Sequence, residues 1–146
     1  MFADLLSRLL APAPAPLDAL DARLALAALL VRVARSDGDY APAEIARIDA
    51  ILAARHGLSP EAAAELRANA EVLEAEAPDT VRFTRAIKDA VPLEDRIQVI
   101  EALWAVVLAD GTRDHDEDAL LRMVANFLGI NDQTSHQARL RVSARL

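Results

Sequence analysis

The sequence predicts an all-α protein, a bundle of about seven helices in which two helix hairpins are related by a repeat. Apolar residues recur at helical spacing along most of the chain, and the period-two alternation of a β-strand is absent. Hydrophobic residues make up 53% of the 146 residues and aromatic residues only 3%, which favours helices packed closely through Ala and Leu. One pattern of helix, acidic turn, helix and Gly-apolar stop occurs twice.

The N-terminal region is expected to be separate from the main domain. Apolar residues at positions 2, 5, 6, 9 and 10 form one stripe of an amphipathic helix. The Ala/Pro run that follows is a stiff extended spacer, because its alternate prolines have fixed φ and lack an N–H. We therefore assign residues 1–16 to this helix and spacer and residues 17–146 to one helical domain. The segment has no basic leader, so we do not expect a signal peptide.

Three helices are expected in the first half of the domain. Two aspartates favour the start of a long helix that runs to about Arg35, and Gly38 supplies a left-handed exit. Proline begins the next helix, over residues 42–56, and a glycine ends it. Ser59 is the expected N-cap of the third helix. The acidic run Glu71, Glu74, Glu76 and Asp79 is expected to be a solvated face, and a contact with a basic partner is the alternative.

The second half is expected to contain four helices. A shorter helix is predicted over residues 79–90, and Pro92 begins the second long helix, in which Trp104 lies on the apolar face and is expected in the core. The D-x-x-E spacing of a capping box opens a partner helix over residues 114–128, which a glycine ends. A last, polar helix is predicted over residues 131–145.

The two copies of the repeat are related by a constant offset in residue number, which we call the repeat offset. It pairs Leu30 with Leu103, Val33 with Val106, Asp37 with Asp110, Gly38 with Gly111, and Glu44 with Glu117. One residue is dropped near the end of the second copy. The shortened offset that results places Gly57-Leu58 on Gly129-Ile130.

The four acidic residues of the repeat need different explanations. Glu44 and Glu117 lie in first helical turns, where a carboxylate favours helix entry. Asp37 and Asp110 lie at helix C-termini, where exposed carbonyls disfavour a carboxylate by about 0.3–1 kcal/mol. Two such placements at equivalent points require a compensating positive group. An arginine would serve, and the candidates are Arg32, Arg35 and Arg113.

A divalent cation is the other candidate for the positive group. If the two hairpins pack about a pseudo-twofold axis, the four carboxylates of the repeat would converge, with Asp39 and Asp114 close by. Oxygen-only ligands favour Ca²⁺ or Mg²⁺ over zinc or copper. The second turn has the alternating oxygens of a calcium loop but is not an EF-hand, because Leu121 occupies the twelfth position. The predicted metal ligands are Asp37, Glu44, Asp110, Glu117, Asp39 and Asp114.

The two motifs resemble those of the TerB family of tellurite-resistance proteins, which is related to the N-terminal domain of the DjlA co-chaperones. The resemblance is carried by residues 33–44 and 107–117 and covers roughly residues 24–130. It implies an all-helical fold whose paired acidic motifs bind a metal ion, here through Asp37, Glu44, Asp110 and Glu117. It also implies a role in stress response, sensing or scaffolding near the membrane rather than an enzyme activity.

Composition limits the remaining function classes. The chain has no Cys, no Gly-rich phosphate loop and no H-E-x-x-H, and we do not expect an enzyme. Its net charge of −7 argues against nucleic acid, and no apolar stretch approaches the ~20 residues of a membrane span. We expect a cytoplasmic protein with an unidentified protein partner, compatible with a homodimer or a peripheral association with a membrane complex. The alternative function is a metal-free interaction module whose acidic residues cap helices and form salt bridges.

Overall fold

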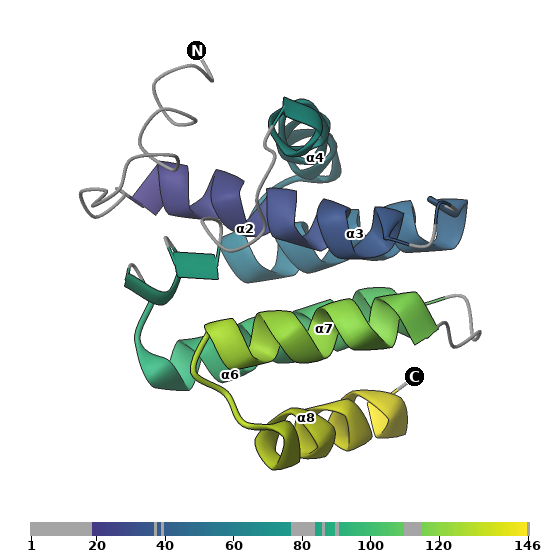
Figure 1. The fold of residues 1–146 in the computed structure, drawn as a ribbon. Coiled ribbons are helices and arrows are strands. Elements are labelled where there is room, and N and C mark those ends of the chain that lie inside the picture. Colours follow the sequence, from purple (N-terminus) through teal and green to yellow (C-terminus); the bar gives the residue numbers. More distant parts are fainter. Residues whose placement is uncertain are drawn as a thin grey trace.

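Helices make up the fold in a computed structural model that describes residues 19–36, 38, 40–76, 84–85, 87–89, 91–109 and 115–145 (Figure 1). Side chains are described from residue 22 onward, except those of residues 115–118. The long helices are α2 (Ala19–Arg35), α3 (Pro42–His56), α4 (Pro60–Glu76), α6 (Leu93–Val107), α7 (His115–Phe127) and α8 (Asp132–Arg145).

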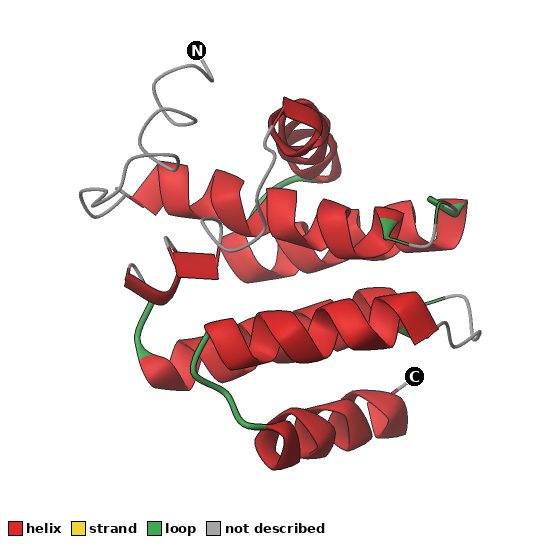
Figure 2. Ribbon diagram, viewed as in Figure 1, coloured by secondary structure: helices red, strands yellow, loops and turns green. Residues whose placement is uncertain are grey.

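The all-α prediction is confirmed, and no strand occurs among the described residues (Figure 2). The observed helix ends agree with the predicted ones to within about two residues, because prolines, caps and glycines act locally. Of the short helix predicted over residues 79–90, the described parts, residues 84–85 and 87–89, are helical. The predicted N-terminal helix and spacer, residues 1–16, lie outside the described residues.

Both predicted Gly-apolar stops end their helices with the same hydrogen bond. The Leu58 N–H donates to the Ala53 carbonyl oxygen at 3.0 Å after α3, and the Ile130 N–H donates to the Ala125 carbonyl oxygen at 2.8 Å after α7. The glycines between them have φ of 63° and 78°, in the left-handed region that glycine tolerates. This is the Schellman arrangement, which satisfies helix-end carbonyls.

The third helix of each group begins with the same side-chain cap. The Ala62 N–H donates to Ser59 Oγ at 3.1 Å, and the Thr134 N–H donates to Asn131 Oδ1 at 2.8 Å. The shortened offset that relates the two glycine stops also takes Ser59 to Asn131. The correspondence therefore extends beyond the predicted hairpins to α4 and α8. We call α2, α3 and α4 the first half and α6, α7 and α8 the second half.

Helices α2 and α6 pack against one another at the centre of the molecule. Helix α2 also contacts α3, α4 and α7, and α6 also contacts α7, α8 and α3. Helix α4 packs on α3 as α8 packs on α7. Each of these contacts has a counterpart in the other half, as a pseudo-twofold arrangement requires. Residues 25–31 of α2 are buried on every side, which is typical of a central helix.

Candidate metal centre

The ends of four helices that carry or flank the acidic motifs lie at one end of the molecule. The C-termini of α2 and α6 and the N-termini of α3 and α7 are all on the right in Figure 1. Asp37 and Asp110 follow the first two helices in the sequence, whereas Glu44 and Glu117 belong to the first turns of the other two. The topology therefore brings the flanking elements of both motifs to a common end.

Glu44 is the predicted ligand whose side chain the structure describes. It is the third residue of α3, and its Oε1 accepts a hydrogen bond from the Ala41 N–H at 3.1 Å. This is the helix-entry role that the sequence predicts for it. Its side chain is nevertheless only 1% exposed. Because desolvation of a carboxylate is costly, such a residue requires partners close to its oxygens.

The structure does not describe the side chains of the other five predicted ligands. Asp37, Asp39, Asp110 and Asp114 lie outside the described residues, and Glu117 is described only as a backbone position in α7. Within the described part of the chain, no group of three or more His, Cys, Asp or Glu side chains could hold a metal ion. Convergence of the six carboxylates stays a prediction.

Two arginines at the end of α2 bind an acidic residue of α4. Arg32 Nε lies 3.3 Å from Glu74 Oε1, and Arg35 Nη1 lies 2.9 Å from Glu74 Oε2. Arg32 Nη2 also donates to the Glu74 carbonyl oxygen at 3.1 Å. The Glu74 side chain is only 13% exposed, so the prediction that the acidic tail of α4 is a solvated face is wrong for this residue. Tertiary packing of α4 along α2 brings the two charges together. We call Arg32, Arg35 and Glu74 the Glu74 cluster.

Further charged contacts surround Tyr40, which lies between the first acidic turn and α3. The Arg35 guanidinium is 4.8 Å from the centroid of the Tyr40 ring, a cation–π distance. Burial of the phenol and the neighbouring Glu71 carboxylate raise the pKa of Tyr40. Arg67 Nε binds Asp49 Oδ1 at 2.7 Å, and this bond raises the pKa of Arg67. The first acidic turn is thus flanked by a charged layer that joins α2, α3 and α4.

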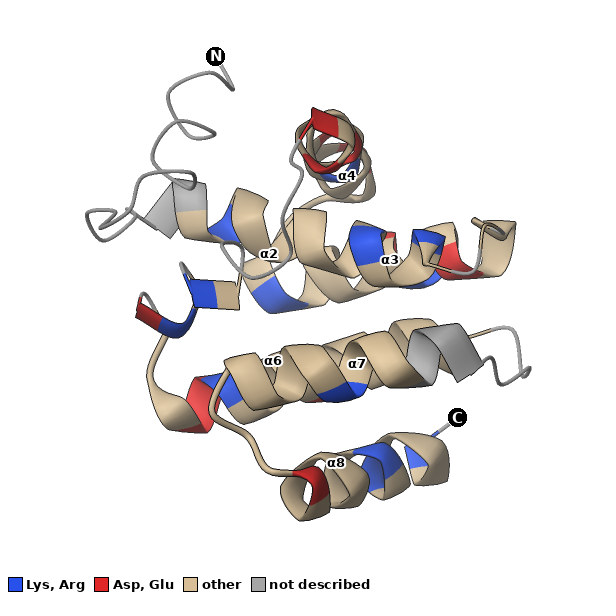
Figure 3. Cartoon of the chain, in the orientation of Figure 1, with Lys and Arg blue, Asp and Glu red and all other residues tan. Residues whose placement is uncertain are grey.

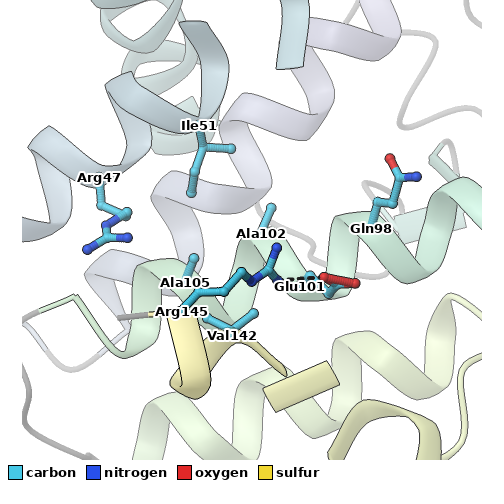
Figure 4. Close-up of a pocket in the computed structure, with 8 residues that line it drawn as sticks. All are labelled: Arg47, Ile51, Gln98, Glu101, Ala102, Ala105, Val142 and Arg145. Atoms are coloured by element: carbon cyan, nitrogen blue, oxygen red, sulfur yellow. Dashed lines mark hydrogen bonds and ion pairs between the residues drawn. The ribbon is translucent and has the colours of Figure 1, made fainter. Parts of the chain in front are cut away.

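A cavity of about 560 Å³ lies between α3, α6 and α8, and its lining residues come from both halves (Figure 4). Arg145 reaches Glu101 at 2.7 Å, and Arg141 lies 3.5 Å from the same carboxylate. The described lining residues include no Ser, Cys, His or Lys that would serve as a nucleophile or base. We call this cavity the α3–α6–α8 groove. It is lined by Arg47, Ile51, Gln98, Glu101, Ala102, Ala105, Val142 and Arg145.

One further expectation concerns a single side chain in the core. Trp104 is 6% exposed, and its Nε1–H donates to Ser135 Oγ at 3.1 Å, which confirms its place in the core. Among the described side chains, the charged residues of α2 are all basic, whereas those of α4 are all acidic except Arg67 (Figure 3).

A family model described as "Tellurite resistance protein TerB" matches residues 23–140 of the chain. The chain belongs to the TerB family. No curated protein and no solved structure matches it. The matched range contains both acidic motifs and reaches from α2 into α8, which confirms the resemblance inferred from the motifs. The match does not identify an enzyme family. In the described part of this TerB-family chain, every helix is too short or too polar to cross a membrane.

Proposed function

We propose that this TerB-family protein is not an enzyme and binds one divalent cation, Ca²⁺ or Mg²⁺, at the end of the molecule where the two acidic motifs begin. The ligands would be Asp37, Glu44, Asp110 and Glu117, with Asp39 and Asp114 nearby. The observation that carries the proposal is the common position of the four helix ends in Figure 1, two from each half. A hard cation would neutralise the clustered carboxylates and hold the two halves together.

The chemistry of the donors supports a hard cation. All six side chains are carboxylates, and oxygen donors are the ligands that Ca²⁺ and Mg²⁺ prefer. Glu44 is buried in the first turn of α3, and one of its oxygens already accepts the Ala41 N–H, which fixes the orientation of the carboxylate. A carboxylate that is already oriented and removed from water favours binding of a cation, because little side-chain entropy is lost when the ion binds.

The α3–α6–α8 groove is the surface that such an ion would control. Arg47 lies one helical turn after Glu44, and Ala105 lies five residues before Asp110, so the groove begins close to both motifs. Its walls come from α3 in the first half and from α6 and α8 in the second half. An ion that fixes the distance between the halves would therefore fix the width of the groove offered to a protein partner.

A calorimetric titration tests the cation site. Chelator-stripped protein is titrated with Ca²⁺, Mg²⁺, Mn²⁺ and Zn²⁺, and the titration is repeated on Asp37→Asn/Asp110→Asn. We expect saturable binding of Ca²⁺ or Mg²⁺ that the double variant loses. The matched control is Asp132→Asn, which removes an exposed carboxylate from the first turn of α8. Absence of binding, or equal binding by the double variant and the control, would overturn the proposal.

A metal-free interaction module is the second candidate function. It is supported by the Ala41–Glu44 bond and the Glu74 cluster, in which carboxylates serve a helix end and an inter-helix contact. In this function the N-terminal helix docks onto a partner or assembles a dimer. Deletion of residues 1–16 tests it: lost self-association, measured by sedimentation, with unchanged circular dichroism would favour the module. Equal sedimentation of both forms would remove that support. A role in stress response and a cytoplasmic location belong to either proposal.

A further inference from the structure

A small basic cavity lies at the opposite end of α3 from Glu44. Its volume is about 210 Å³, and it is bounded by α2, the end of α3, the segment around residues 87–91, and α6. Three of its lining residues are basic, and none of the described lining residues is acidic. We call it the basic pocket. The basic side chains are Arg23, Arg55 and His56, and the apolar ones are Ala22, Leu26, Ile87, Val91 and Val99.

Two side chains of the basic pocket each have a buried polar atom that makes no hydrogen bond. Neither Arg23 Nε nor His56 Nε2 has a hydrogen-bond partner in the described part of the chain. An unsatisfied buried donor costs about 1–3 kcal/mol, so a ligand that offers acceptor oxygens would gain from Arg23 Nε–H, and from His56 in the tautomer that carries its proton on Nε2. Burial, and then the charges of Arg23 and Arg55, lower the pKa of His56 to about 4. At neutral pH the imidazole is uncharged, so the two arginines supply the positive charge of the pocket.

In the second half, the arginine equivalent to Arg23 forms a hydrogen bond to a carbonyl oxygen at a helix end. The repeat offset takes Arg23 to Arg96, whose Nη1 donates to the Leu128 carbonyl oxygen at 2.7 Å, just beyond α7. The shortened offset takes His56 to Leu128. Arg23 makes no equivalent bond within the described chain, although the end of α3 is close enough to line the same cavity. Arg96 Nε, like Arg23 Nε, has no hydrogen-bond partner in the described part of the chain, so the two arginines differ in the bond that Arg96 Nη1 makes. Without that bond, the guanidinium of Arg23 is available to a ligand.

We propose that the basic pocket binds a small organic anion, a carboxylate carried on a short apolar body. The planar carboxylate matches the hydrogen-bonding fork of an arginine, and a second arginine adds charge. The apolar walls formed by Leu26, Ile87 and Val99 would cover the rest of the ligand. A bare inorganic anion would leave these walls without contacts. The site is at the far end of α3 from the acidic motifs and is independent of the cation proposed above.

Hexanoate is a suitable probe, because it joins one carboxylate to a short chain. Binding is measured by calorimetry at pH 7 on the full chain, with acetate and 1-hexanol as controls for charge alone and for apolar body alone. We expect saturable binding of hexanoate, tighter by about tenfold or more than binding of either control. Equal affinities for hexanoate and acetate, or no binding of hexanoate, would overturn the proposal.

Variants locate the binding within the molecule. We expect Arg23→Gln to weaken hexanoate binding by about tenfold or more, whereas the matched control Arg96→Gln retains it. Arg55→Gln is the second variant, and circular dichroism checks that each protein is folded. The imidazole resonances of His56 provide a further reading, since a bound carboxylate should raise its pKa from about 4. Binding that survives both Arg23→Gln and Arg55→Gln, or a His56 pKa that hexanoate leaves unchanged, would contradict the assignment.

Discussion

The two halves of the molecule bury equivalent positions through different side chains. The repeat offset relates the buried face of α2 to that of α6 and pairs the buried Ile48 with the buried Leu121. After the dropped residue, the shortened offset pairs buried positions of α4 with buried positions of α8. The pairs are Leu26 with Val99, Ala27 with Ile100, Leu30 with Leu103, Val33 with Val106, Ala34 with Val107, Ala63 with Ser135, and Ala70 with Val142.

The polar contacts of the two halves are not equivalent. Arg32 and Arg35 bind Glu74 in the first half, but the equivalent positions of the second half hold Ala105, in α6, and Leu108, directly after it. The second half instead buries a Trp104–Ser135 hydrogen bond, where the first half has the apolar pair Val31 and Ala63.

This difference separates what the fold requires from what each half adds. Burial of apolar side chains is non-directional and depends only on position along a helix, so many residue pairs satisfy it. Ion pairs and hydrogen bonds need specific partners at specific distances. The Glu74 cluster braces the helix before the first acidic motif, and the residues that replace its arginines in the second half carry no charge.

The largest expected effect tests whether equivalent core leucines of the two halves contribute equally to the free energy of unfolding. Leu30 and Leu103 are both fully buried, so Leu30→Ala and Leu103→Ala should each lower the free energy of unfolding by about 2–5 kcal/mol. Urea unfolding followed by circular dichroism measures both changes. A loss below about 1 kcal/mol in one variant alone would show that the two halves do not share one core.

The Glu74 cluster should show the next largest effect. Glu74→Gln leaves the two arginines of the cluster without their shared carboxylate, and we expect a loss of about 1–3 kcal/mol. The matched control is Glu101→Gln, because Glu101 also binds two arginines but those are 50% and 63% exposed. We expect the control to cost about 0–1 kcal/mol. Equal losses in urea unfolding would mean that burial of Glu74 does not strengthen its ion pairs.

A pH dependence should be specific to the first half, because His56 corresponds to Leu128. The folded protein holds the His56 pKa near 4, below the ordinary value of 6.5, through burial and then through Arg23 and Arg55. The unfolded chain therefore binds a proton first, and stability falls as pH decreases from 6.5 to 4, by about 1–2 kcal/mol after screening. His56→Leu should remove this slope in thermal unfolding, whereas the exposed control His136→Gln should keep it. A slope that survives His56→Leu would assign the pH dependence elsewhere.

The smallest effects, of equal size in both halves, are expected at the caps of α4 and α8. Ser59→Ala and Asn131→Ala each remove the acceptor of one exposed N–H and should cost about 1 kcal/mol. Ser143→Ala, on the exposed face of α8, is the control and should change stability by less than about 0.5 kcal/mol. Cap effects that differ by more than about 1 kcal/mol would weaken the correspondence between α4 and α8.

The fold class, the helix ends and the apolar faces could be predicted from the sequence. These features are local: Ser59, Pro42 and Gly57 act on backbone groups within a few residues, and helical periodicity selects the face that is buried. Local spacing also predicted that Glu44 favours helix entry, and in the structure its Oε1 accepts the Ala41 N–H. For the candidate metal centre, the sequence named the acidic residues and the repeat that relates them.

Contacts between residues far apart in the sequence could not be predicted, because they depend on how the helices pack against each other. Arg32 and Glu74 are far apart in the sequence, and the residues that line the basic pocket come from separate helices. No local sequence pattern therefore marks either group. The common position of the four helix ends likewise follows from the packing of α2 on α6. Capping and periodicity act over one or two helical turns, whereas the pairing of charges depends on how whole helices are placed against each other.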